Sequence, residues 1–222
     1  MFIGHYAVAL AAKRAAPRAS LGALVAGAQL ADLLWPILLL LGVEHVRLVP
    51  GLMAASPLDL WDYPISHSLL TLFGWGALLG LLWFALARDV RSAIVVGLCV
   101  PSHWLLDWWM HRPDLPLWPW GGPKLGLGGW RSLPLTIGLE SAMFFLGGLV
   151  YVRATRPRDR IGRFGLAGLL ALLAAAFTSS LFVPPPASER ALAWGALSMW
   201  LLVPLAAWID RHREPASAQP VA

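Results

Sequence analysis

The chain has 222 residues, of which 58% are hydrophobic and only 13% are charged. Because a soluble domain usually carries about 25% charged residues, this composition argues against a soluble globular enzyme and against a disordered chain. The single cysteine, Cys99, excludes an internal disulfide framework and a cysteine-based zinc cluster, and the net charge of +5 in so apolar a chain indicates membrane topology rather than nucleic-acid binding.

Apolar stretches of about 20 residues, the length that spans a bilayer, recur along the chain at 20–42, 66–87, 92–111, 133–152, 164–184 and 190–208. A shorter apolar stretch, 2–12, comes first and lacks the cleavage pattern of a signal peptide, so we expect a half-helix that dips into the bundle. The predicted fold is an all-α, polytopic integral membrane helical bundle with about six transmembrane helices plus this short N-terminal half-helix.

Two parts are expected along the chain. Residues 1–155 form a helical membrane core that carries the candidate metal site, with outer loops at 43–65 and 112–132. Residues 156–222 supply two further transmembrane helices and a short polar tail, for which the sequence gives no motif.

The distribution of basic residues predicts the orientation. Most of the 17 lysines and arginines fall in loops on one side of the predicted membrane, with a dense run at 153–163, and cytoplasmic loops are enriched in such residues. We therefore expect a multi-pass protein of the bacterial inner membrane whose loops 43–65 and 112–132 face the periplasm. Tryptophans gather in these loops, either as an interfacial aromatic belt or as surfaces that stack on a substrate.

Several ionisable side chains lie within the predicted membrane segments, where such groups are costly and usually functional. They are His5, Asp32, His67, His103, Asp107 and Glu140. Any one of them alone is equally well explained as a buried polar group bonded to a neighbouring helix. At a rise of about 1.5 Å per residue, however, all of them fall in one layer of the outer leaflet, whereas unrelated polar residues would scatter in depth.

Spacing adds a second argument for a metal site. His103, Asp107 and His111 follow one another at intervals of four residues, which places them on one face of a helix. Imidazoles and carboxylates together suit a divalent metal, with zinc expected first and manganese or iron as alternatives. The predicted ligand set is His5, Asp32, His67, His103 and Asp107.

These residues lie in recognisable motifs. The segments Gly4-His5, Ala31-Asp32, Ser66-His67-Ser68-Leu69, Ser102-His103-x-x-x-Asp107 and Leu117-Trp118-Pro119 resemble those of the YdjM-like family of membrane-bound metal-dependent hydrolases. The resemblance covers residues 4–119 and implies a metal-dependent hydrolase. The chain departs from the family where Asp62-Tyr63-Pro64 replaces an H-R-G triplet, and where Leu34 stands at a position that often holds a second aspartate. Asp62, His111 and Glu140 are the candidates to replace the missing groups.

The sequence therefore favours an enzyme that cleaves an ester or phosphoester of a lipid or lipid-linked substrate with a metal-activated water. Asp62 or Glu140 would orient the water or move a proton. Arg112, Lys124 and Arg131 lie in a glycine-containing outer loop that either meets an anionic headgroup or is an ordinary interfacial loop.

The alternative function is a metal-ion or proton-coupled transporter that uses the same cluster. The position of the polar groups towards one face disfavours a conduit across the membrane. A purely structural subunit would leave the histidines at membrane depth unexplained. The sequence does not indicate an oligomeric state.

Overall fold

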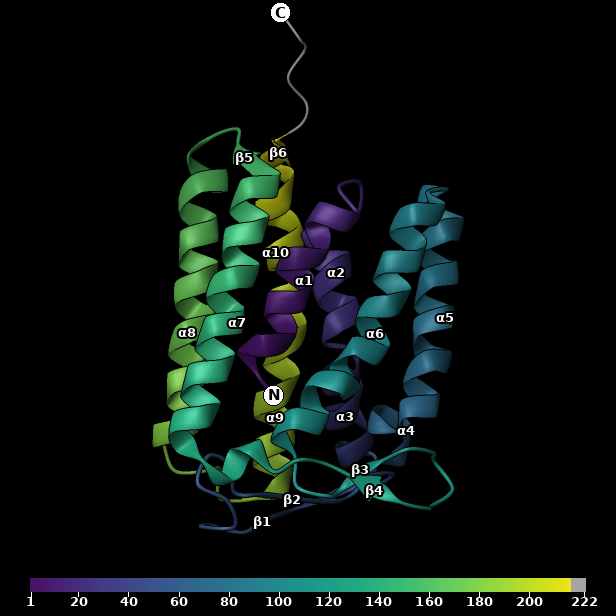
Figure 1. Ribbon diagram of the computed structural model, residues 1–222, viewed down its shortest axis with the longest axis vertical. Coiled ribbons are helices and arrows are strands. Elements are labelled where there is room, and N and C mark those ends of the chain that lie inside the picture. Colours follow the sequence, from purple (N-terminus) through teal and green to yellow (C-terminus); the bar gives the residue numbers. More distant parts are fainter. Residues whose placement is uncertain (217–222) are drawn as a thin grey trace, which may run out of the picture.

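The structure is a computed structural model and describes residues 1–216. It is a bundle of helices whose long members run side by side, with short strands at both ends (Figure 1). The helices are α1 (Ile3–Ala15), α2 (Leu21–Ala28), α3 (Leu30–Leu40), α4 (Pro64–His67), α5 (Leu69–Ala87), α6 (Val90–Met110), α7 (Leu133–Ala154), α8 (Leu166–Phe182), α9 (Glu189–Ala196) and α10 (Leu202–Arg211). A π-helical turn, Ile161–Gly165, leads into α8, and a 3-10 segment, Leu197–Leu201, joins α9 to α10.

Within the described residues, five continuous helical stretches are long and apolar enough to cross a bilayer. They are Leu69–Ala87, Val90–Met110, Leu133–Ala154, Ile161–Phe182 and Glu189–Arg211. The pair α2 and α3 passes the same test when taken together, which gives up to six spans. The all-α, polytopic class predicted from the sequence is thus confirmed.

The first predicted span, 20–42, is not one continuous helix. Its two halves, α2 and α3, meet at Gln29 and are bent by 58° relative to each other. A carbonyl in the last turn of a helix has no partner within that helix and is free to accept a hydrogen bond from elsewhere. Here the Ala28 carbonyl at the end of α2 accepts from His103 Nδ1 at 2.8 Å, so the break supplies a fixed point for a side chain of the candidate site.

The short N-terminal helix, α1, lies in the middle of the bundle, packed along α7, α2 and α6 (Figure 1). Close approach to α7 depends on Gly147, where an added Cβ would lie only 2.4 Å from the Ala7 carbonyl oxygen. Small residues at helix contacts are typical of membrane bundles, because they let two backbones approach closely. The predicted half-helix is therefore an interior element, and it carries His5 into the core.

Helix α4 is a separate turn before α5. The expected span 66–87 begins at Leu69, because Ser68 has an extended backbone and its side chain caps α5 by accepting from Thr71 N–H. The N-cap hydroxyl satisfies one of the donors that a helix start leaves unpaired. The turn places His67 at the end of α4, on the inner side of the bundle, where it is buried.

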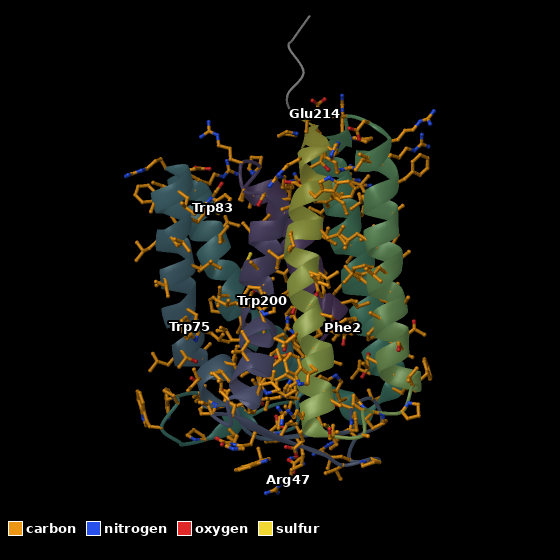
Figure 2. All side chains as sticks on the ribbon, turned by 180° about the vertical axis from the view of Figure 1, so that it is seen from behind. Phe2, Arg47, Trp75, Trp83, Trp200 and Glu214 are labelled. Atoms are coloured by element: carbon orange, nitrogen blue, oxygen red, sulfur yellow. The ribbon has the colours of Figure 1, made fainter. Side chains whose placement is uncertain are left out.

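Short antiparallel strand pairs, which the sequence analysis did not predict, order the connecting loops. They are β1 (His45–Leu48) with β2 (Leu58–Asp62), β3 (Leu115–Pro116) with β4 (Lys124–Leu125), and β5 (Thr155–Pro157) with β6 (Arg213–Pro215). The first two pairs form the predicted outer loops at one end, and the third lies at the opposite end with the basic run 153–163 (Figure 1). Figure 2 shows the same polarity, with Arg47 and Glu214 at opposite ends of the bundle.

The helices after residue 155 pack against those before it. Helix α9 contacts α3, α10 contacts α2, and α8 contacts α1. The largest buried apolar cluster joins residues such as Ile3 and Leu24 to Leu169, Leu173 and Ile209. The two predicted parts thus share one core, and the predicted boundary at 155 falls at the end of α7.

Candidate metal centre

The five ligands predicted from the sequence come together from four helices. His5 lies on α1, Asp32 on α3, His67 at the end of α4, and His103 and Asp107 on α6. Their potential ligand atoms form two overlapping groups, His5–His103–Asp107 and Asp32–His67–His103, and within each group these atoms lie within 4.8 Å of one another. The structure therefore brings together residues that are up to 102 positions apart in the chain.

Asp107 is at the centre of the first group. Its Oδ2 is 3.1 Å from His103 Nε2, and its Oδ1 is 3.1 Å from His5 Nε2. The rings of His5 and His103 are stacked with centroids 3.6 Å apart, so both imidazoles present nitrogen to the same carboxylate. All three side chains are buried, so the Asp107 carboxylate needs a compensating positive charge, which the Met1 amino group or a bound cation can supply.

Asp32 is the carboxylate of the second group and is more open. Its Oδ1 lies 3.5 Å from His67 Nε2 and 3.8 Å from His103 Nε2. The Asp32 side chain is 20% exposed, whereas the His103 side chain is fully buried. The cluster is therefore closed on the side of α1 and α6 and accessible on the side of Asp32.

The chemistry of His103 fits a bound cation. Because the Ala28 carbonyl can only accept, His103 Nδ1 must carry the hydrogen, and the lone pair of the neutral ring is on Nε2. This buried Nε2 has no hydrogen-bond partner among residues 1–216, although it faces both Asp32 and Asp107. Two ligand atoms of a tetrahedral zinc ion lie about 3.3 Å apart, close to the distance between His103 Nε2 and Asp107 Oδ2. The donor set thus fits a divalent metal.

His67 is held by Glu44, which sequence reasoning missed, and by Ser66, which it noted only as part of a motif. Its Nδ1 lies 2.7 Å from Ser66 Oγ, and this hydroxyl donates to the buried carboxylate of Glu44 at 2.6 Å. Glu44 also accepts from the backbone N–H groups of Ile65 and Ser66, which ties the outer loop to the start of α4. Such a carboxylate relay fixes the orientation of a metal-binding imidazole. Nothing in the spacing of the sequence links Glu44 to His67.

His111, predicted as a catalytic candidate, occupies a similar setting. Its Nε2 is 3.6 Å from Asp107 Oδ2, and its Nδ1 is 3.1 Å from Asp114 Oδ1. Tyr63 donates to the same Asp114 oxygen at 3.2 Å. Burial raises the pKa of the Tyr63 hydroxyl well above its usual range, with the Asp114 charge adding to the effect, so the hydroxyl stays a donor. His111 therefore borders Asp107 without belonging to either candidate metal-binding group of the described residues, and its catalytic role stays a prediction.

Glu140, the other predicted catalytic candidate at membrane depth, anchors the start of α1. Its Oε2 accepts from the backbone N–H groups of Phe2 at 2.7 Å and of Gly4 at 3.2 Å. A carboxylate is stabilising at a helix N-terminus, where N–H groups have no partner within the helix. The Met1 amino group at the same end contacts Asp107. Glu140 therefore helps to hold His5 in place and also borders the site.

The remaining predicted residues lie in the outer loops and engage other partners. Asp62 pairs with His45 across the β1–β2 hairpin at 2.8 Å, and Arg112 binds Asp59 and Asp114. Lys124 donates to the Trp61 carbonyl, and Arg131 is exposed in the turn before α7. Among the described residues, none of these four side chains belongs to the lining of the cavity beside the cluster. Their proposed roles in proton transfer and headgroup binding stay predictions.

A cavity of about 880 Å³ adjoins the open side of the cluster. Its polar end is formed by Asp32, His67, Asp107, His111 and Glu140. Small-molecule sites in proteins occupy about 300–1,000 Å³. The cluster therefore faces a space large enough for a substrate.

The fold and the site together define a polytopic helical membrane protein with a buried histidine–aspartate cluster that could hold a metal ion near one end. Residues 1–183 match the family model of the YdjM inner membrane protein, so the chain belongs to this family and is a multi-pass inner membrane protein. The matched region runs from α1 through α8 and contains the whole cluster. Comparisons with curated proteins and with solved structures gave no match.

Proposed function

We propose that this protein is a metal-dependent hydrolase of the membrane that cleaves an ester or phosphoester of a lipid or lipid-linked substrate. The observation that carries the proposal is the convergence of His5, Asp32, His67, His103 and Asp107 beside a cavity. Intramembrane ionisable residues are rare and usually functional, and this chain brings five of them together. The cluster lies on helices near the β1–β4 end, and the enrichment of basic residues at the opposite end supports a reaction at the level of the outer-leaflet headgroups.

The donor types favour zinc, with manganese and iron as alternatives. His103 and His67 each have Nδ1 engaged by a protein partner, which leaves Nε2 of both rings directed at Asp32. Second partners of this kind are usual for metal-binding histidines, because they fix the ring and its tautomer. When bound, the metal supplies Lewis acidity towards the scissile group and a water of lowered pKa.

The remaining roles, which are holding the site together, orienting water and transferring protons, fall to side chains of the protein. Asp107 is buried and contacts both His103 and His5, so it would hold the metal and keep the site together. Asp32 is the more accessible carboxylate, and Glu140 borders the same cavity, so these two can orient a water molecule or accept a proton from it. His111 and its partner Asp114 can return a proton to the leaving group. Burial of His5, His103 and Asp107 excludes bulk water from that part of the cluster and strengthens the interactions there.

The metal is tested by elemental analysis of the purified full-length protein. We expect at least one transition-metal ion per chain, and its loss in His103→Ala and in Asp107→Asn. The control is Asp89→Asn, which changes a carboxylate at the opposite end of the same helix, where it accepts from Ser92. Equal metal content in all four proteins would refute the site.

The reaction is tested with the same preparations in detergent. Hydrolysis of a phospholipid ester or phosphoester should be removed by a chelator, restored by zinc and lost in Asp107→Asn. Metal uptake into proteoliposomes without any hydrolysis would instead support the transporter and overturn the enzyme.

A further inference from the structure

The cavity beside the metal centre extends away from the cluster into a mainly apolar groove, whose walls also carry Ser179, Ser180 and Ser198. One wall is α8, which contributes Leu173, Ala176 and Phe177, and the other wall runs from α9 to α10, with Leu192, Met199 and Leu205. Phe2, which also lines the cavity, is labelled between α8 and the α9–α10 stretch in the view of Figure 2. The groove and the metal centre are thus parts of one continuous space.

Both walls belong to membrane-spanning stretches, Ile161–Phe182 and Glu189–Arg211. On the rims of the groove, Leu172 is 50% exposed and Leu201 is 70% exposed. Large apolar side chains exposed at this depth face lipid chains, since a span is surrounded by hydrocarbon. The groove therefore opens sideways into the bilayer, while its other end reaches the buried carboxylates and imidazoles.

We propose that this groove binds an acyl chain of a membrane lipid and so places the linkage next to the lipid headgroup at the metal centre. The inference rests on the proposed hydrolase function and narrows its substrate to acyl lipids that enter laterally from the membrane. It also assigns a role to α8 and α9, for which the sequence shows no motif: they form the substrate's apolar binding site.

The groove has apolar walls and ends at polar side chains, and this combination favours a lipid as its ligand. An amphiphile satisfies both, because its chain replaces lipid contacts in the groove and its headgroup linkage reaches the polar end. A transmembrane helix of a partner or of a second copy would cover the rims but would leave the polar end, with His67 and Asp107, unfilled. A water-soluble ester would leave the apolar walls unused.

The groove can be tested by photolabelling the full-length protein in nanodiscs of phosphatidylcholine doped with a phospholipid that carries a diazirine in its acyl chain. We expect cross-links concentrated on the groove-facing residues of α8 and α9. Ala176→Trp fills the groove and should abolish this labelling, and Ala196→Trp should do the same from the opposite wall. The matched control is Ala175→Trp, because Ala175 is exposed on α8 and lies outside the cavity lining given by the described residues.

The inference would be overturned if labelling were spread evenly over all lipid-facing helices, or if it were unchanged in both groove variants. Cross-linking of a second copy of the chain in the groove would also overturn it. Metal content and hydrolysis are measured on the same samples. Hydrolysis without labelling of the groove would refute acyl-chain binding in the groove but would still agree with the proposed hydrolase function. Labelling of the groove without bound metal or hydrolysis would refute the proposed hydrolase function but would still agree with lipid binding in the groove.

Discussion

The Ser66 hydroxyl donates to Glu44 Oε2 at 2.6 Å and, on its other side, lies 2.7 Å from His67 Nδ1. Because a carboxylate only accepts, the hydroxyl hydrogen points to Glu44, and Ser66 Oγ must accept from His67 Nδ1–H. The lone pair of the His67 ring is therefore on Nε2, which faces Asp32 at 3.5 Å. A loop residue outside the membrane segments thus determines which nitrogen of His67 is free to bind a metal.

Glu44→Gln tests this relay with almost no change in shape. The amide oxygen can still accept from the backbone N–H groups of Ile65 and Ser66, but the amide nitrogen then donates to Ser66 Oγ. The hydroxyl hydrogen turns towards His67 Nδ1 and moves the ring hydrogen to Nε2, which blocks metal binding there. We expect metal affinity to fall by about 10–100-fold, the usual effect of losing such a partner.

The measurement is a competition titration with a chromogenic chelator, together with the ¹⁵N shifts of the imidazole nitrogens, which report the tautomer. Glu189→Gln is the control, since Glu189 is exposed at the start of α9. An unchanged affinity in Glu44→Gln, with the His67 tautomer also unchanged, would show that the relay does not act on the metal centre.

Two buried tyrosines give a contrasting pair of stability predictions. Tyr63 donates to Asp114, whereas the buried Tyr6 hydroxyl has no hydrogen-bond partner in the part of the chain that the structure describes. Tyr63→Phe should lower the free energy of unfolding by about 1 kcal/mol, because it removes a satisfied buried hydrogen bond. Tyr6→Phe should leave stability unchanged or raise it, because it removes a buried polar group that is unpaired.

Reversible unfolding in mixed detergent measures both variants under the same conditions. Equal losses in the two variants would contradict the prediction, because both keep the buried ring and differ only in whether the lost hydroxyl had a hydrogen-bond partner.

The ligands of the candidate site were predictable because they break the pattern of their surroundings. A charged or imidazole group such as Asp32 or His103 stands out in an apolar segment, and the four-residue spacing to Asp107 shows a shared helix face. The resemblance to the family, carried by the same residues, was confirmed by the match over residues 1–183. The helical class followed from segment length and composition alone.

The supporting residues were not predictable in the same way. Glu44 and Asp114 lie in outer loops, where acidic residues are common and carry no signal of burial. The strand pairs depend on contacts between segments of two to five residues, too short to show an alternating pattern. The bend at Gln29 and the groove beside α8 depend on how apolar helices pack. Such helices are apolar on most faces, so the sequence does not indicate which face meets a neighbour.

The contact between α1 and α7 should affect metal binding, because α1 carries His5. In Gly147→Ala the new methyl group would lie 2.4 Å from the Ala7 carbonyl oxygen and 2.7 Å from its Cα, so α1 must move. Because α1 carries His5, we expect weaker metal binding together with a stability loss of about 1–3 kcal/mol, the usual cost of overpacking.

Gly138→Ala is the matched control on the same helix, since nothing in the described structure lies within 4 Å of its added Cβ. It should raise stability by up to ~1 kcal/mol through helix propensity alone and leave the metal content unchanged. If Gly147→Ala is destabilised but still binds metal like the unmodified protein, the packing of α1 against α7 does not control the geometry of the metal centre.

The orientation of the bundle in the membrane can be determined by labelling two introduced cysteines. Ala54 is exposed in the loop between β1 and β2, and Ala87 is exposed at the end of α5, near the opposite end of the bundle (Figure 1). The native Cys99 is buried, so it should contribute little background.

Since basic residues concentrate at the end that holds β5 and β6, this end should be cytoplasmic. An impermeant maleimide added to intact spheroplasts should therefore label Ala54→Cys and leave Ala87→Cys unlabelled until the membrane is disrupted. The reverse pattern would place the metal centre at the cytoplasmic face and move the proposed substrate to the inner leaflet.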